Sequence, residues 1–510
     1  MEKQLILIVN FKGQYSMIIA RRVREMSVYC EIVGYKEALK KAKDLKPSGI
    51  IFSGSPNSVL DKDAPKIEKE IFGLNIPILG ICYGAQLIAD CFDGKVVKGE
   101  HGEFGKTKTN FNLNSKLFKN AKEFSDSLMS HTDKIESLPS NFKIIANSKL
   151  TKIAAFEDEE RKIFATQFHP EVLDTENGTQ IFYNFLFNIC GCEKNWQLKS
   201  YLKTTIEEIK KTVRQKKVLL ALSGGVDSCV VAAILNRAIG KNLTAVFVDH
   251  GFLRKDEEKE ISNYFKDWDF NFIAVDAKDI FLEKIKGIVE PEEKRKIVGE
   301  TFIEVFEQEA KKIGKIDFFA QGTIYPDIIE SGEKDDQKAT IKSHHNVGGL
   351  PEKMNFKKIL EPLKFLFKDE VRKIGESLNL PDFLVKRQPF PGPGLCIRIL
   401  GEVTKEKLEI LKKADFVFRR EIEKLPEKPD QYFAVLTNVK SVGVMGDSRS
   451  YCYVLALRAV KTTDFMTAQA FDFSISQLMD ISKKIVNEVK EINRVVYDVT
   501  TKPPATIEFE

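Results

Sequence analysis

The chain has 510 residues, 43% of them hydrophobic and 30% charged, with a formal net charge of +5. This composition is typical of a globular protein of about three domains, and the small positive excess favours anionic small molecules over nucleic acid as partners. No apolar run approaches the roughly 18–20 residues that span a bilayer, and the N-terminus lacks the pattern of a secretory signal.

The first third of the chain alternates short aliphatic runs with helical stretches. Strands with two apolar faces, typical of a parallel sheet, are predicted at residues 4–9, 49–52, 76–81 and 163–168. Helices are predicted at residues 21–26 and 85–91, and an aromatic-rich helix at residues 179–189. The pattern indicates an open α/β sheet domain over residues 1–193.

A charged helical connector at residues 199–216 leads into a second α/β pattern. A strand at residues 217–222 is followed by a glycine-rich loop and a helix at residues 228–239, and further strands are predicted at 243–248, 272–275 and 318–321. This predicts a second doubly wound domain, residues 194–385, with the loop at the carboxyl end of its first strand. The polar segment 331–354 is long enough that we expect it to have a function.

From residue 386 the chain becomes richer in β-structure, with predicted strands at residues 432–436, 453–460 and 494–497 and helices between them. We expect a smaller α+β domain over residues 386–510. The predicted fold class is therefore α/β, with two doubly wound open-sheet domains followed by this α+β domain. The eight cysteines are scattered, and Cys190 and Cys192 lack the second pair of a zinc site, so we expect a reducing, cytoplasmic location.

The first candidate site is the strand-to-helix turn at Cys82. A cysteine reacts as the thiolate, and a helix N-terminus or a nearby imidazole lowers its pKa. Gly80 and Gly84 leave room for a sharp elbow, His169 follows another strand, and Glu171 is placed to orient the imidazole. A lone cysteine at a strand end is more often a buried hydrophobic residue. The glycine elbow and the His-x-Glu pair favour a catalytic triad instead.

An oxyanion formed at Cys82 requires hydrogen-bond donors, and backbone N–H groups at Tyr83 and Ser55 are the candidates. These segments resemble the class I glutamine amidotransferase domain, whose glutamine-holding loop is similar to the sequence Ser-His-Thr-Asp at residues 130–133. Two departures from that family stand out. Ser55 replaces a second glycine, and residues 10–14 read Asn-Phe-Lys-Gly-Gln in place of Asp-Phe-Gly-Ser-Gln.

The second candidate site is the run Ser223, Gly224, Gly225, Val226, Asp227 and Ser228. It lacks the Gly-Lys-Ser/Thr ending of a Walker loop, but two glycines before a helix allow backbone N–H groups to converge on phosphate oxygens. Asp227 would repel phosphate unless a cation lies between them, so the run implies Mg²⁺ held by Asp227. A glycine pair alone is usually structural, whereas six residues in this order after an apolar strand are much more specific.

The run resembles the N-type ATP pyrophosphatases. The resemblance extends the phosphate-binding residues through Cys229, places residues 246–249 beside the adenine, and adds Lys364 as the lysine that neutralises the leaving pyrophosphate. Relatives in that group make NAD, argininosuccinate, asparagine and thiolated tRNA, so the two sites leave the acceptor open.

Motifs along the rest of the chain resemble those of the glutamine-hydrolysing GMP synthetases. They lie, in the family's order, at residues 293–296, 320–323, 342–346, 389–395, 444–447 and 502–508. The family match implies that xanthosine monophosphate (XMP) is bound by Arg295, Asp447, Lys502, Ile507 and Glu508. Phe509 replaces the tryptophan usual in the family's C-terminal Glu-Trp-Glu.

The resemblance implies that ATP and Mg²⁺ adenylate the C2 oxygen of XMP, after which ammonia released from glutamine gives GMP. It implies a homodimer formed by residues 386–510, transfer of ammonia without release to bulk water, and neither a prosthetic group, nor nucleic-acid or membrane partners. The family loop that carries His344 and His345 is a lid over the adenylate, and without nearby acids or cysteines we expect no metal there.

Two alternatives remain open. Glutamine-dependent NAD synthetase normally has a glutaminase without a Cys/His-x-Glu triad, and thermal stabilisation by XMP or by deamido-NAD would distinguish the two enzymes. A tRNA-binding module with an inactive pyrophosphatase loop would need a basic, aromatic face, which the charge balance does not indicate. Filter binding with a salt titration would test that class.

Overall fold

The computed structural model describes residues 4–13, 15–332, 356, 358–445, 448–462 and 467–510. The chain divides into two compact units, the first containing residues 1–201 and the second containing residues 202–331 and the C-terminal part of the chain. Among the described residues, no helix is both long and apolar enough to cross a bilayer.

The first unit is built on a nine-stranded sheet with the order β2-β1-β3-β4-β9-β8-β7-β5-β6. Five strands are parallel: β1 (Ile6–Asn10), β2 (Cys30–Gly34), β3 (Gly49–Phe52), β4 (Ile78–Ile81) and β9 (Ile163–Thr166). The other four extend it antiparallel: β5 (Lys95–Phe111), β6 (Phe124–Ser137), β7 (Lys143–Ser148) and β8 (Ala155–Asp158).

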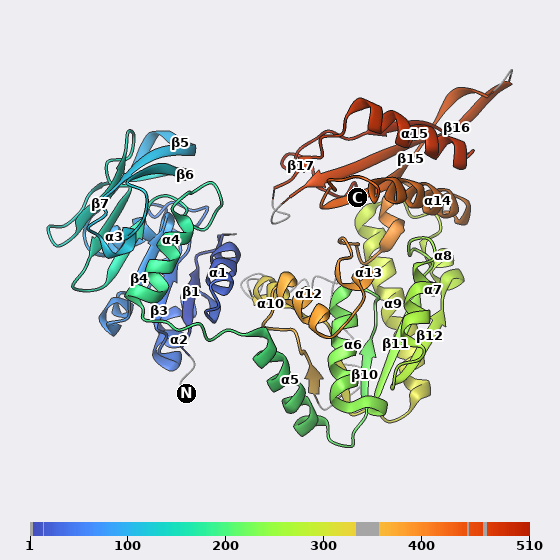
Figure 1. The fold of residues 1–510 in the computed structure, drawn as a ribbon, viewed down its shortest axis with the longest axis horizontal. Coiled ribbons are helices and arrows are strands. Elements are labelled where there is room, and N and C mark those ends of the chain that lie inside the picture. The colour runs from blue at the N-terminus through green and yellow to red at the C-terminus, as the bar shows by residue number, and fades with distance from the viewer. Residues whose placement is uncertain (1–3, 14, 333–355, 357, 446–447, 463–466) are drawn as a thin grey trace. The chain divides into compact units, whose positions relative to one another are not determined.

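The helices of this unit pack around the parallel half of the sheet (Figure 1). They are α1 (Ser16–Glu25), α2 (Ala38–Leu45), α3 (Tyr83–Cys91) and α4 (Gly178–Tyr183), which continues as a π-helix over Asn184–Ile189. Every residue of β1, β3, β4 and β9 is buried, because aliphatic side chains on both strand faces are covered. The carboxyl ends of β3, β4 and β9 therefore meet at one edge, where the first site lies.

The second unit contains a five-stranded parallel sheet with the order β12-β11-β10-β13-β14. Its strands are β10 (Val218–Ala221), β11 (Leu243–Asp249), β12 (Asn271–Asp276), β13 (Phe318–Ala320) and β14 (Lys358–Leu360). The helices are α5 (Leu198–Val213), α6 (Val226–Ile239), α7 (Glu257–Phe265), α8 (Lys278–Ile285), α9 (Pro291–Ile313), α10 (Tyr325–Gly332), α12 (Lys368–Ser377) and α13 (Asp382–Val385). The strand order reverses between β10 and β13, which is where ligands bind in open α/β sheets.

The C-terminal part of this unit is a sheet backed by two helices (Figure 1). The strands β15 (Gln431–Met445) and β16 (Ser448–Lys461) form a long antiparallel pair, and β17 (Gln469–Ala470) and β18 (Ile492–Tyr497) pair with β16. The helices α14 (Lys405–Ile422) and α15 (Ile475–Glu488) pack against it. The short helix η6 (Gly394–Arg398) leads into this region from α13.

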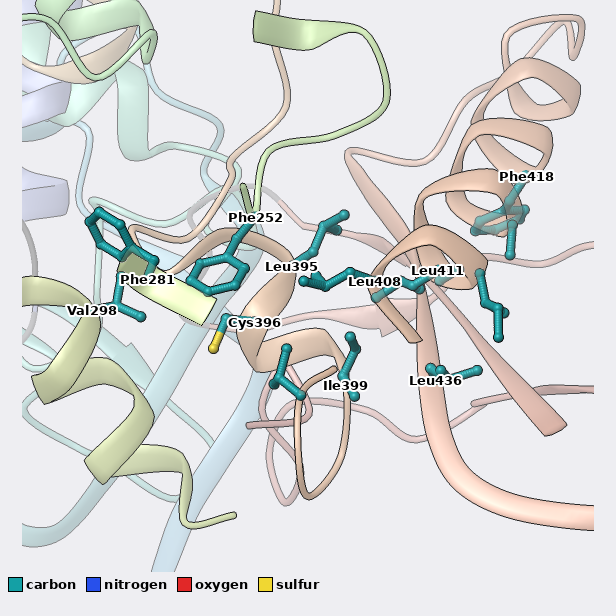
Figure 2. Packing of buried hydrophobic residues seen from close by; sticks show 14 of the residues in the cluster. Phe252, Phe281, Val298, Leu395, Cys396, Ile399, Leu408, Leu411, Phe418 and Leu436 are labelled. Atoms are coloured by element: carbon teal, nitrogen blue, oxygen red, sulfur yellow. The ribbon is translucent and has the colours of Figure 1, made fainter. Parts of the chain in front are cut away.

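One hydrophobic core joins the parallel-sheet half of the second unit to its C-terminal part (Figure 2). Phe252 and Phe281 from the parallel-sheet half contact Leu395 and Cys396 of η6, and the same cluster continues to Leu411 of α14. A core shared in this way resists independent movement of the two halves. The domain boundaries that we predict after residues 193 and 385 stay predictions.

The predicted fold class is confirmed: two open α/β sheets precede a smaller part with antiparallel strands. The antiparallel strands β5 to β8 were not predicted. In β6, for example, buried and more exposed residues alternate, so it lacks the continuous apolar run of a strand buried on both faces. The long helices α9 and α14 were also not predicted as elements.

Candidate active sites

Cys82 lies in a strained turn between β4 and α3. Its φ is +53°, a region that side-chain-bearing residues rarely adopt, and such strain is typical of a nucleophile elbow. A Cβ on Gly80 would lie 2.8 Å from the backbone of Gly84, and a Cβ on Gly84 would lie 2.6 Å from the carbonyl oxygen of Phe52. Glycine is therefore needed on both sides of the turn, as the sequence predicted.

His169 and Glu171 follow β9, the strand that neighbours β4 in the sheet. The Nδ1 of His169 lies 2.7 Å from Oε1 of Glu171, and both side chains are buried. The carbonyl oxygen of His169 accepts a hydrogen bond of 2.6 Å from the hydroxyl of Thr175, and Tyr15 places its ring 4.6 Å from the imidazole. The imidazole is thus held on several sides.

The charge state of His169 follows from these neighbours. Burial alone favours the neutral imidazole, but the charges of Glu171 and Cys82 outweigh burial and hold the pKa of His169 well above its usual range. A protonated imidazole beside the sulfur favours the thiolate form of a cysteine. The arrangement can therefore supply a nucleophile and a proton donor for a leaving ammonia.

A cavity of about 690 Å³ opens over this triad, and its lining includes Cys82, His169 and both predicted oxyanion donors, Ser55 and Tyr83. Tyr83 is the first residue of α3, so its N–H has no acceptor within the helix. Residues 130–133, also in the lining, belong to the strand β6 and not to a loop. The carbonyl oxygen of Asp133 accepts a hydrogen bond of 2.9 Å from the side chain of Gln86, which the sequence reading missed.

The glycine-rich loop of the second unit connects β10 to α6. Gly224 has a φ of +75°, and an added Cβ would lie 2.4 Å from the side chain of Ile261. The hydroxyl groups of Ser223 and Ser228 lie 3.0 Å apart, and the N–H of Gly225 donates to Ser223. The loop is therefore tightly folded by its own polar groups at the start of α6. Backbone N–H groups at a helix start can bind an anion by donating hydrogen bonds to it.

Asp227 is paired with Lys368, and the lysine predicted to neutralise the leaving pyrophosphate, Lys364, is a different residue. The Nζ of Lys368, at the start of α12, lies 2.7 Å from Oδ2 of Asp227. Lys364 places its Nζ 5.0 Å from the ring centre of Phe365, and no contact between Lys364 and the loop is found among the described residues. No motif pointed to Lys368, which is 141 residues from Asp227 along the chain.

The remaining oxygen of Asp227 fits a role in holding a cation. Its Oδ1 is buried and has no hydrogen-bond partner within the described part of the chain. Among those residues, no group of three His, Cys, Asp or Glu side chains could hold a metal ion by itself. The unpartnered oxygen fits Mg²⁺, which is commonly bound through one or two carboxylates together with substrate phosphates.

The structure argues against Cys229 as a contact to phosphate. Its side chain is fully buried, and burial raises the pKa of its thiol to about 12. Its backbone N–H donates to the carbonyl oxygen of Gly225 at 3.1 Å within α6. Neither group is available to a ligand, because a helix uses the N–H of its fourth residue internally. Val226, the first helical residue, keeps its N–H outside that ladder.

Neighbouring strand ends complete the surroundings of the loop. An added Cβ on Gly322, two residues after β13, would lie 3.1 Å from the Cβ of Asp227, so a side chain at this position would crowd Asp227. At the end of β11, Asp249 forms an ion pair of 2.9 Å with Lys278. Arg387, whose role the sequence did not indicate, donates to the carbonyl oxygen of Gly224 at 2.8 Å.

The predicted XMP residues lie mostly on the C-terminal tail. Glu508 accepts two hydrogen bonds from Arg398, at 2.8 and 3.0 Å, and one of 2.9 Å from Gln431. The side chain of Ile507 is buried in an apolar cluster, so only its backbone could contact a ligand. Arg295, in the first turn of α9, donates to the carbonyl oxygen of the last residue at 2.5 Å.

The structure pairs Lys502 with Ala468 through their backbones. Two predictions fall outside the described residues: Asp447, and the polar segment that carries His344 and His345.

Three family models match in the order expected: glutamine amidotransferase class-I over residues 7–189, a PP-loop domain over residues 198–280, and the GMP synthase C terminal domain over residues 420–509. A protein of Finegoldia magna named "GMP synthase [glutamine-hydrolyzing]" is 56% identical over 100% of both chains. The chain belongs to the glutamine-hydrolysing GMP synthase family.

A second member, from Treponema denticola and of the same name, is 57% identical over 99% of this chain and 97% of its own. The resemblance that the sequence motifs indicated is thereby confirmed over the full length. Family membership explains why a thiol site and a phosphate-binding loop occur in one polypeptide.

Proposed function

We propose that the chain is an ATP-dependent ligase that converts XMP to GMP with nitrogen taken from glutamine. The observation that carries the proposal is the presence of both chemistries in one full-length family member. The first is a Cys82, His169 and Glu171 triad under a cavity. The second is a phosphate-binding loop with an acidic residue at the reversal of a parallel sheet.

The first unit supplies ammonia. The thiolate of Cys82 attacks the side-chain amide of glutamine, backbone N–H groups of Tyr83 and Ser55 stabilise the oxyanion, and His169 donates a proton to the departing ammonia. Glu171 keeps the imidazole oriented and charged. Water then releases glutamate from the thioester and restores the thiol.

The second unit activates XMP. Residues 223–228, without Cys229, bind the phosphates of ATP, and Lys368 joins Lys364 as a candidate cation for the leaving pyrophosphate. Asp227 would hold Mg²⁺, which screens the phosphate charges and orients them. The C2 oxygen of XMP displaces pyrophosphate from the α-phosphorus of ATP, and ammonia then displaces AMP from C2.

Binding of XMP is assigned to Arg295, Lys502, Glu508, the backbone of Ile507, and Asp447. Arg398 fixes the carboxylate of Glu508 with two hydrogen bonds, which leaves acceptor capacity on its Oε2 for a donor on the nucleotide. Arg295 and Lys502 suit a phosphate because both are cationic donors.

An isotope experiment tests the reaction. XMP carrying ¹⁸O at C2 is converted with ATP and ammonia, and the products are analysed by mass spectrometry. The proposal requires the label in AMP. Label in water or in orthophosphate would show that no adenylate forms at C2 and would overturn it.

We also propose a homodimer formed by the C-terminal part. Val444 and Ile475 are each 77% exposed, and Val442, Tyr451 and Met479 are exposed as well. These side chains lie on β15, β16 and α15, and exposed large apolar side chains are common at protein interfaces. Light scattering at micromolar concentration should give a dimer for the wild type and a monomer for Val444→Glu combined with Ile475→Glu. A monomeric wild type would contradict the proposal.

We propose a cytoplasmic location because of the state of the cysteine thiols. All eight cysteines are free, as expected in a reducing compartment.

A further inference from the structure

The C-terminal tail, residues 498–510, is held by three cations that have no solvent exposure. They are Arg398 of η6, Arg458 of β16 and Lys294 of α9, and the side chain of each is 0% exposed. A buried cation is costly unless its hydrogen bonds are satisfied. Each of the three cations belongs to a different element, and each donates hydrogen bonds to the tail.

Arg458 holds the backbone of the tail at both sides of a turn. Its Nη1 donates to the carbonyl oxygen of Thr500 at 2.6 Å, and its Nη2 donates to that of Thr506 at 3.1 Å. The same guanidinium forms an ion pair of 3.1 Å with the carboxylate of Asp498. Lys502, proposed to bind XMP, lies between these anchor points.

The backbone at the turn is fixed from the opposite side as well. Lys502 and Ala468 exchange two hydrogen bonds, of 2.8 and 3.0 Å. Ile507 then returns the chain to an apolar cluster that includes Phe433 and Val435. The tail between them is therefore a preformed element and not a frayed terminus, which is the usual state of the last residues of a chain.

Lys294 anchors the end of the tail. Its Nζ pairs with the side-chain carboxylate of Glu510 and donates to the carbonyl oxygen of Ile399 at 2.8 Å. The other oxygen of that carboxylate accepts from the N–H of Gly401 at 3.2 Å. Arg295 donates to the backbone carbonyl of the same Glu510. The last residue thus links the start of α9 to the loop after η6.

The side chains of Arg458 and Lys294 have no solvent exposure, so neither is placed to contact a ligand directly. We propose that Arg458 is a positioning residue for XMP binding: it sets the placement of Lys502 and Glu508, and the Lys294–Glu510 pair acts as a second anchor of the same tail. The inference rests on the proposed function. A binding element that is already ordered avoids the entropy of ordering when the ligand arrives.

The test uses the full-length protein with Arg458→Gln and Arg458→Lys. Lysine keeps the charge but cannot bridge two carbonyl groups with a planar fork. In the ammonia-driven reaction, Arg458→Gln should raise the KM for XMP by about tenfold or more and change the KM for ATP by less than about twofold. Arg458→Lys should give an intermediate KM for XMP. A merely structural arginine would alter both KM values or neither.

A second variant keeps the test decisive if Arg458→Gln does not fold. Glu510→Gln removes the negative charge that pairs with Lys294 but keeps the shape of the side chain. This variant should also raise the KM for XMP more than the KM for ATP. Arg420→Gln is the matched control, because Arg420 pairs with Glu488 and Glu421 away from the tail. Its KM for XMP should equal that of the wild type.

Hydrogen exchange of the C-terminal peptide gives a readout that does not depend on activity. Exchange over residues 499–510 should be faster in Arg458→Gln than in the wild type or in Arg420→Gln. A loosened tail with an unchanged KM for XMP would overturn the inference, and so would an equal rise in the two KM values. If the wild type made no GMP from XMP, the proposed function would fail, and exchange would still report whether these cations hold the tail.

Discussion

Lys368 and Asp227 form an ion pair of 2.7 Å beside the glycine-rich loop at residues 223–228. The lysine stands at the first position of α12, and the aspartate at the second position of α6. The pair fixes one carboxylate oxygen and leaves the other buried without a partner among the described residues. An ammonium group and an unpartnered carboxylate oxygen therefore lie side by side at the glycine-rich loop.

Replacing Lys368 tests this relationship. Lys368→Met should lower the rate of GMP formation by about 100-fold with either nitrogen source, because the developing charge on pyrophosphate loses a fixed cation. Release of pyrophosphate is the quantity to measure. Lys364→Met is the comparison variant, and a larger loss there than at Lys368 would return the pyrophosphate role to Lys364.

The nucleophile can be separated from the ligase chemistry. Cys82→Ala should lower glutamine-driven GMP formation by more than about 1000-fold and leave the ammonia-driven rate close to that of the wild type, because only the first unit needs a thiol. Both rates are measured on one preparation. If both were lost together, the assignment of the two chemistries to two units would be wrong. Cys190→Ala serves as a control for the loss of another free thiol in the same unit.

The local part of the first site could be predicted, since Gly80, Cys82 and Gly84 lie within five residues and the elbow requires small neighbours. The pairing of Asp227 with Lys368 could not, because a lysine at a helix start is usually solvated and only the tertiary fold brings it to the loop. Arg458 gave a signal that was missed. It interrupts an apolar run on β16, and an arginine in such a strand needs buried acceptors.

The acid–base behaviour of the triad gives a prediction about pH. Glu171 raises the pKa of His169, so the imidazole stays protonated to higher pH and can still donate to the leaving ammonia there. Glu171→Gln removes that charge, and the pKa of His169 falls. The alkaline limb of glutamine-driven activity should move to lower pH, and the maximal rate should drop about tenfold or more.

The control for Glu171→Gln is the ammonia-driven reaction, whose pH profile should be the same in both proteins. An alkaline limb that stays in place while the rate falls would mean that the carboxylate orients the ring without tuning its charge.

Stability in acid depends on His250, which is buried between Phe252 and Phe281. Burial lowers the pKa of His250 to about 4, from 6.5 in the unfolded chain. Between these values the unfolded state binds a proton that the folded state does not. Stability is therefore fully present above pH 6.5 and falls as the pH drops toward 4, by up to about 3 kcal/mol from this group. His250→Gln should weaken this acid dependence.

Thermal unfolding of the second unit at pH 7 and pH 5 checks this effect. The chain has two tryptophans, and in a Trp196→Phe background Trp268, beside Phe265 of α7, reports on the second unit alone. The difference in Tm between the two pH values should be smaller in His250→Gln than in its parent, because a glutamine takes up no proton in this range. In the folded protein, the Nδ1 of His250 accepts a hydrogen bond from the N–H of Phe252. If the Tm difference between pH 7 and pH 5 were equal in the two proteins, titration of His250 would contribute nothing to stability. Carboxylates alone would then set the lower pH limit of stability.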